Sequence, residues 1–145
     1  MKYYSNSRRC ATRLHYPVPV GYDFAAEDAG TSYRLNDWQM GHVRLVMLEA
    51  GAVAGDGLAR LFGNERFAPS ADTVPVGHFS SNDGWQVTAA QCAFIAARLR
   101  AALDADLIGD MALFYYDQPT QLRDWVEEFA AFNEQATAQG GYRVS

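Results

Sequence analysis

Residues 88–103 read TAAQCAFIAARLRAAL, and this stretch does more than any other to determine the fold. Thr88 followed three residues later by Gln91 is the signature of a capping box, in which the two side chains bind backbone amides at a helix start. Apolar residues then recur every three or four positions: Cys92, Ile95, Ala96, Leu99, Ala102 and Leu103. A stripe with this period predicts an amphipathic helix that packs one face against a core.

A second helix is predicted over Asn36–Ala50, NDWQMGHVRLVMLEA. Asn36 is a favourable N-cap with Gln39 three residues later, and Gly51 provides the stop. The apolar stripe of this helix consists of Val43, Val46, Met47 and Ala50. Gly41 in the helix interior costs roughly 1 kcal/mol relative to alanine, which predicts that another part of the chain packs closely against it.

A third helix is predicted from about Thr120 to Ala138, and the pair Gly140 and Gly141 ends it. Its apolar stripe is rich in aromatic residues: Leu122, Trp125, Val126, Phe129, Phe132 and Ala136. Most of the remaining positions are polar or acidic, as expected for a helix with one face in solvent.

The other segments are short. TSYRL at 31–35, MALFYY at 111–116 and the closing YRVS at 142–145 are of strand type, and a strand is also expected at Val74–Phe79. GDGLARLFG at 55–63 predicts a short helical turn that Asp56 caps and Gly63 ends. Together these elements predict a single α+β domain over residues 1–145, with three main helices packed on a small, mostly antiparallel sheet.

The composition is that of an ordinary globular protein, with 49% hydrophobic and 20% charged residues. The net charge of -5, from 12 basic and 17 acidic residues, argues against a dominant role in nucleic-acid binding. The exception is residues 1–14, which carry Lys2, Arg8, Arg9 and Arg13 with no acidic residue. This basic arm is a candidate contact for nucleic acid or an acidic partner, and the alternative is a solvated, mobile terminus.

The cysteines and histidines do not predict a metal site. Cys10 and Cys92 are far apart, and no histidine belongs to a ligand motif. The glycine-rich GAVAGDG at 51–57 lacks the Walker lysine, so no phosphate-binding cofactor is predicted either. Without an apolar signal segment or a membrane span, a soluble cytoplasmic protein is the expectation.

The stretch GHFSSNDGWQVT at 77–88 contains the residue types of a hydrolase site. His78, Ser80 or Ser81, and Asp83 could supply the base, nucleophile and orienting acid of a catalytic triad. A structural explanation competes with this one, since Asn82, Asp83 and Gly84 favour a turn and Thr88 caps the following helix. The hydrolase interpretation therefore depends on His78 lying within hydrogen-bond reach of a serine.

A second set of candidates suits a protein interface. Tyr115 and Tyr116 stand just before the third helix, and Glu127 with Glu128 gives that helix an acidic face. The alternative is that the tyrosines complete the edge of the core while the glutamates are solvated.

FSSNDGWQVTAAQC at 79–92 resembles a motif of small uncharacterised bacterial proteins, FSSNDG-x-x-VT, at a helix start. The resemblance extends to a helix bearing Trp125, Phe129 and Phe132 and to the ending GGYRV at 140–144. It implies no activity, and no catalytic residue is transferred.

The leading hypothesis is a non-enzymatic cytoplasmic domain that binds a protein, as an immunity-like or regulatory partner or as a homo-oligomer. The excess of acidic over basic residues would favour a basic partner. A small hydrolase based on His78, Ser80, Ser81 and Asp83 is the alternative.

Overall fold

The computed structural model describes residues 21–28, 30–55, 57–113 and 118–145. One antiparallel sheet has the strand order β2-β1-β6-β5, and β3 pairs with β4 in a small parallel ladder. The strands are β1 (Gly21–Ala26), β2 (Ser32–Asn36), β3 (Val53–Ala54), β4 (Val74–Pro75), β5 (Trp85–Val87) and β6 (Tyr142–Val144). The helices are α1 (Asp37–Glu49), α2 (Ala89–Asp104), α3 (Leu107–Ala112) and α4 (Pro119–Thr137), with single 3-10 turns η1 (Glu65–Phe67) and η2 (Val76–Phe79). The predicted α+β class with three main helices is confirmed.

The helix starts follow from local sequence. Asn36 caps α1 and Thr88 caps α2, and in each case the glutamine three residues later completes a capping box. Gly51 follows α1 with φ +73°, and a Cβ there would collide with the carbonyl oxygen of Phe67. Only glycine fits such a position without strain, which explains why the helix stops there.

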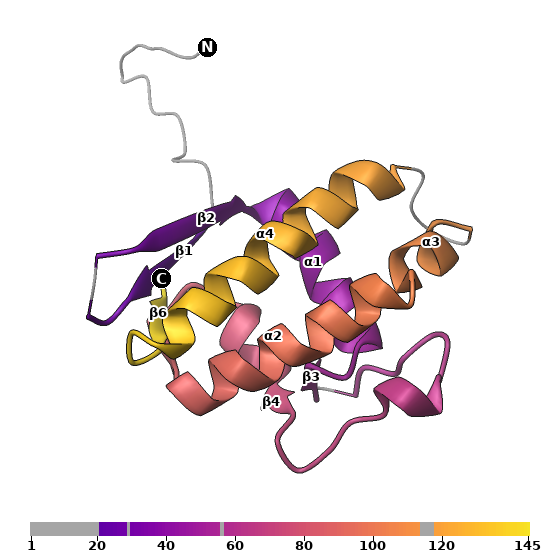
Figure 1. Ribbon diagram of the computed structural model, residues 1–145, viewed down its shortest axis with the longest axis horizontal. Helices are drawn as coiled ribbons and strands as arrows, with labels where there is room; N and C mark the ends of the chain where they lie inside the picture. The colour runs from indigo at the N-terminus through magenta and orange to yellow at the C-terminus, as the bar shows by residue number, and fades with distance from the viewer. Residues whose placement is uncertain (1–20, 29, 56, 114–117) are drawn as a thin grey trace.

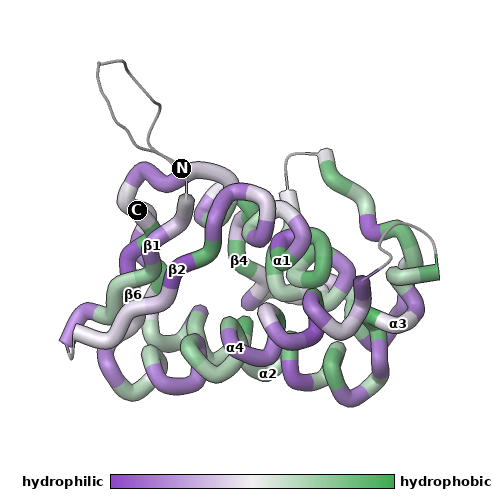
Figure 2. Tube along the Cα trace, turned by 90° about the horizontal axis from the view of Figure 1, so that it is seen from above, coloured by the Kyte–Doolittle hydropathy of each residue, from purple (hydrophilic) through white to green (hydrophobic). Residues whose placement is uncertain are grey.

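Figure 1 shows α2 and α4 running side by side along the molecule, with β1, β2 and β6 at one end. Apolar and polar residues alternate along both helices in Figure 2. All six predicted stripe residues of α4 are buried, as are five of the six in α2, where Leu103 is partly buried. The predicted core faces of these helices are therefore confirmed.

The strand predicted over residues 111–116 is wrong where the structure describes it. Met111 and Ala112 belong to α3, and residues 114–117 lie outside the described part. Asp106 starts α3 from a left-handed conformation and accepts a hydrogen bond from the amide of Gly109. Leu107, Ile108 and Met111 then bury one side of a helical turn, so local capping overrides the strand-like composition.

The helical turn predicted over residues 55–63 is also wrong. Asp56 lies outside the described residues, and residues 57–63 contain no helix. The backbone there is bound instead by Glu49, whose side chain is only 4% exposed. Its carboxylate accepts the amides of Leu61 (2.5 Å) and Phe62 (3.2 Å), which replaces the hydrogen bonds of a helix.

Two smaller expectations are corrected. Only Val74 and Pro75 of the predicted strand 74–79 are extended, because Val76–Phe79 forms a 3-10 turn beyond Pro75. Gly41 was expected at a close contact, but a Cβ there would meet no atom within 4 Å. The glycine is therefore not required by packing.

An aromatic cluster forms the core between the sheet and α4. The Phe24 ring, at 0% exposure, lies 5.0 Å from Phe129 and 5.7 Å from Tyr142 between ring centroids. The buried Tyr142 hydroxyl donates to Asn133 Oδ1 at 2.9 Å, and Asn133 Nδ2 donates to the carbonyl of Phe129. Since a buried polar group without a partner is costly, this network fixes how β6 docks on α4.

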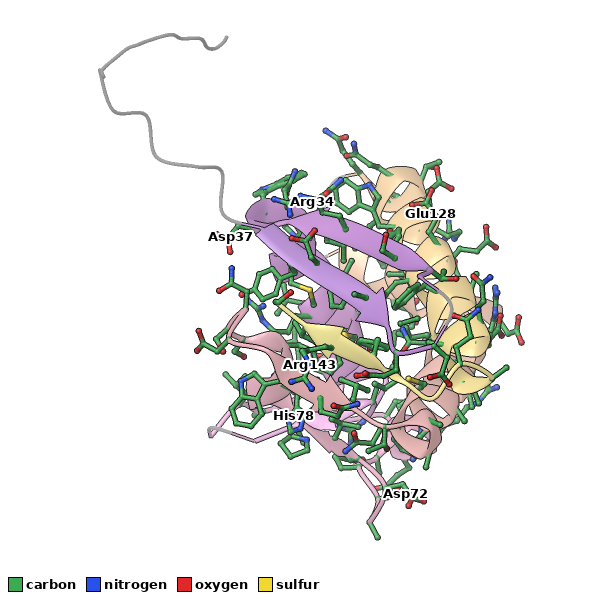
Figure 3. The ribbon with its side chains drawn as sticks, turned by 90° about the vertical axis from the view of Figure 1, so that its left-hand side faces the viewer. Arg34, Asp37, Asp72, His78, Glu128 and Arg143 are labelled. Atoms are coloured by element: carbon green, nitrogen blue, oxygen red, sulfur yellow. The ribbon has the colours of Figure 1, made fainter. Side chains whose placement is uncertain are left out.

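The opposite face of the sheet is polar. Arg34 of β2 forms an ion pair with Asp23 of β1 at 2.7 Å, and Arg143 of β6 donates to Gln86 of β5. Figure 3 shows Arg34 and Arg143 on this outward side. The described helices therefore cover only one face of the sheet, as is common for antiparallel sheets. Among the described helices, none has the length and apolar character needed to cross a bilayer.

Candidate functional site

The loop at 77–88 is organised around Trp85, which begins β5. The Trp85 indole packs against the His78 imidazole of η2 with 4.9 Å between ring centroids. Its Nε1 donates to Ser81 Oγ at 3.1 Å. The imidazole thus meets an aromatic ring rather than a nucleophile.

The structure does not assemble the predicted triad. Ser80 Oγ donates to the carbonyl of Val76 at 3.0 Å, and Ser81 Oγ is the acceptor for Trp85. Neither hydroxyl is hydrogen-bonded to His78 within the described residues, and Asp83 is exposed on the turn. A serine without a base is a poor nucleophile, so this arrangement does not provide an activated one.

The structural roles predicted for this loop are observed. Gly84 has φ +90°, and Asn82 Nδ2 donates to the carbonyl of Gly21 at 3.0 Å, which ties the turn to β1. Thr88 and Gln91 make the capping box of α2.

The other predicted site residues do not belong to the 77–88 loop. Tyr115 and Tyr116, and the arm residues Arg8, Arg9 and Arg13, lie outside the described residues. Glu127 and Glu128 are both exposed on α4. Among the residues that the structure describes, no group of three histidine, cysteine or acidic side chains could hold a metal ion.

A second candidate region contains a solvent-exposed tryptophan that is held in place by contacts with other rings. Trp38, in the first turn of α1, is 56% exposed, although its indole makes edge-to-face contacts with Trp125 of α4 (5.4 Å) and His42 (4.7 Å). Tyr33 of β2 lies beside the same part of α4, stacked on Phe129 with 6.0 Å between ring centroids. Three secondary-structure elements therefore place aromatic rings at one junction of the molecule.

Acidic residues neighbour these rings in the sequence, and one of them, Glu128, contacts Tyr33 in the structure. Asp37 precedes Trp38, and Asp124 and Glu128 flank Trp125 on one side of α4, four residues apart. Within the described residues, neither Asp37 nor Asp124 forms an ion pair. We call this region the Trp38 surface and define it as Tyr33, Asp37, Trp38, Asp124, Trp125 and Glu128.

Hydrogen bonding and burial fix the charge state of the surface. The Tyr33 hydroxyl donates to Glu128 Oε1 at 3.0 Å. Burial, and then the nearby Glu128 carboxylate, raises the pKa of Tyr33, so the hydroxyl stays protonated and remains a donor. Burial lowers the pKa of the His42 imidazole, which keeps the ring neutral near pH 7. The Tyr33 hydroxyl and the His42 imidazole are therefore both uncharged near pH 7.

Sequence reasoning missed Trp38, although a signal was present. The buried side of α1 is defined by Met40, Val43 and Met47. Because an α-helix turns by about 100° per residue, Trp38 lies on the opposite side of this helix. Leu45 shares that outer side with Trp38 and is also exposed. A tryptophan placed away from the apolar stripe of a surface helix marks a candidate contact site.

Comparisons with protein-family models, curated protein sequences and solved structures found no match to this chain.

Proposed function

We propose that this chain is a non-enzymatic, cytoplasmic protein-binding domain whose partner docks on the Trp38 surface. The observation that carries the proposal is a tryptophan that is mostly exposed yet held by two ring contacts. Tryptophan is enriched among the residues that dominate binding energy, and a side chain ordered in advance loses less entropy on binding. The proposed partner is a different protein, of regulatory or immunity-like type.

Three observations support this proposal, and the first of them argues against the hydrolase. The serines at 80 and 81 have hydrogen-bond partners other than His78. The surface combines an aromatic centre with a polar rim, as protein interfaces do. The thiol of Cys92 is free and buried, which suits a reducing compartment.

Capture experiments with two tryptophan variants test the proposal. Tagged wild-type protein, Trp38→Ala and Trp85→Ala are each incubated with lysate of the producing cells, and bound proteins are quantified by mass spectrometry. We expect Trp38→Ala to capture less of the partner by a factor of roughly ten or more, because truncating an anchor side chain costs about 2 kcal/mol of binding free energy. Trp85 is also exposed, at 45%, and its variant is the matched control that retains capture.

Thermal unfolding of each variant verifies that it is folded before capture. The proposal would be contradicted if Trp38→Ala captured the same proteins, in the same amounts, as the wild type and Trp85→Ala. Light scattering of the purified wild-type protein tests whether a second copy of the chain covers the Trp38 surface instead. In that case the wild type would be a dimer, and Trp38→Ala would dissociate it.

A further inference from the structure

We infer that residues 16–20, YPVPV, dock on the exposed indole of Trp38 and cover it while the partner is absent. This inference rests on the proposed function, because it adds a regulation of that same surface: the partner must displace a segment of the chain itself. Residues 16–20 lie outside the described part of the structure, and the observations that carry the inference concern the described residues beside their point of attachment.

The segment joins the domain beside the first turn of α1. Gly21, the first residue of β1, is paired with Asn36, which caps α1 two residues before Trp38. The carbonyl of Gly21 also accepts a hydrogen bond from Asn82 Nδ2 at 3.0 Å, so the point of attachment is fixed. Figure 3 shows Asp37 beside this end of β1. The chain therefore enters the sheet close to the exposed indole.

A few residues are enough to cover the distance to the indole. Paired residues of an antiparallel sheet lie about 5 Å apart between Cα atoms, and two further residues of chain add at most about 8 Å. The Cα atom of Trp38 is thus within about 13 Å of that of Gly21. Four residues of extended chain span up to about 14 Å, so the stretch from Pro17 to Val20 can reach the indole.

The sequence of the segment suits an exposed aromatic ring. Pro17 and Pro19 each fix their own φ at about −65° and favour extended backbone at the preceding residue. Extended proline-containing segments dock on aromatic side chains, because they have little conformational entropy left to lose. The Trp38 indole is 56% exposed, and its ring plane meets those of Trp125 and His42 at 83° and 77°. Neither of these two rings stacks flat on the indole, whose exposed part is available to a proline ring.

Covalent attachment and charge both favour contact within one molecule. A short tether gives the segment an effective concentration in the millimolar range at the nearby indole, so even a weak contact is well populated. Residues 1–20 contain four basic residues and no acidic residue, whereas residues 21–145 contain 8 arginines and 17 acidic residues. These opposite net charges attract the segment to the rest of the chain.

Substitution of the two prolines tests the contact in the full-length chain. The chain has three tryptophans, so a proton–nitrogen NMR spectrum shows three indole signals, assigned by single Trp→Phe variants. Pro17→Gly with Pro19→Gly should shift the Trp38 signal and leave the Trp85 signal in place. The position of the wild-type Trp38 signal should not depend on protein concentration, because the contact is intramolecular.

Two controls separate docking from a general effect of the substitutions. Ser5→Gly with Ser7→Gly adds the same number of glycines farther from the domain and should shift none of the three signals. Adding the free peptide YPVPV to the proline variant should return its Trp38 signal towards the wild-type position in a saturable way. The peptide YGVGV, which lacks both prolines, should not.

Capture from lysate tests the regulation. The proline variant should capture about threefold more partner than the wild type, as expected if the segment covers the indole about two thirds of the time. Ser5→Gly with Ser7→Gly should capture the wild-type amount. Equal capture by the wild type and the proline variant would show that the segment does not compete with the partner, and would overturn the inference.

An unchanged Trp38 signal in the proline variant, or an equal response to YGVGV, would also overturn the inference. So would a wild-type Trp38 signal that moves with protein concentration, because a second copy would then supply the occupant. If the proline variant changes nothing while Trp38→Ala still abolishes capture, the binding function stands and the docked segment is wrong. If the segment docks while capture is insensitive to Trp38→Ala, the intramolecular contact stands and docking of the partner on this surface is wrong.

Discussion

Replacing Phe24 with alanine is expected to lower the free energy of unfolding by about 3–5 kcal/mol, the usual cost of truncating a buried phenylalanine. The ring is fully buried, and it is the hub of the aromatic core. Its centroid lies within 6.5 Å of five others, those of Tyr33, Phe79, Phe129, Phe132 and Tyr142. Because these rings come from the sheet, η2 and α4, the cavity would loosen contacts among all of them.

Urea unfolding at neutral pH measures this loss. Ala25 is the neighbouring residue on the solvent side of β1, and Ala25→Ser should change the free energy of unfolding by less than about 0.5 kcal/mol. Phe24→Leu keeps most of the volume and should cost less than alanine. A Phe24→Ala protein as stable as wild type would show that this cluster is not the centre of the core.

Raising the pH is expected to unfold the protein through ionisation of buried groups. Burial raises the pKa of the Cys92 thiol from 9.0 to about 12, and burial also raises the pKa of Tyr142 and Tyr33 well above 10. Groups with a raised pKa in the folded state release protons more readily when unfolded. Their stabilising effect is complete below pH 9 and is lost as the pH rises through the folded values.

The free energy of unfolding should therefore fall by roughly 1 kcal/mol or more per pH unit above pH 9, and more steeply above pH 10. Urea unfolding in reducing buffer from pH 7 to 11 measures this slope. Tyr142→Phe removes one of the groups and should flatten the slope above pH 10. It also leaves Asn133 Oδ1 without its donor, so the variant should start from a lower stability at pH 7. A wild-type stability that is constant up to pH 11 contradicts the prediction.

The helices could be predicted because their signals are local. The capping boxes of Asn36 and Thr88 and the stripe of α4 each lie within a few turns of one helix. The strands depend on distant partners. β1 pairs with β2 on one side and with β6, near the end of the chain, on the other. β5 has only three residues and is defined by its pairing with β6, so the sequence of Trp85–Val87 alone did not indicate a strand.

The candidate site was less predictable for a related reason. The reactive residue types concentrated in 77–88 predict a site in that loop, but the side chains of Ser80, Ser81 and Asn82 form hydrogen bonds with Val76, Trp85 and Gly21. The Trp38 surface is assembled from β2, α1 and α4, whose contributing residues are far apart in sequence. Glu128 was a candidate on its own helix, and its link to Tyr33 is visible only in the folded chain.

Labelling the three tryptophans with 5-fluorotryptophan tests the location of the binding surface most directly. Fluorine NMR of the labelled protein in unfractionated lysate reports only on those side chains, because the other proteins carry no fluorine. If the partner docks on the Trp38 surface, the Trp38 signal should change its chemical shift most, with a smaller change at Trp125 and none at Trp85. A shift at Trp85 with Trp38 unchanged would place the contact at the 77–88 loop and contradict docking on the Trp38 surface.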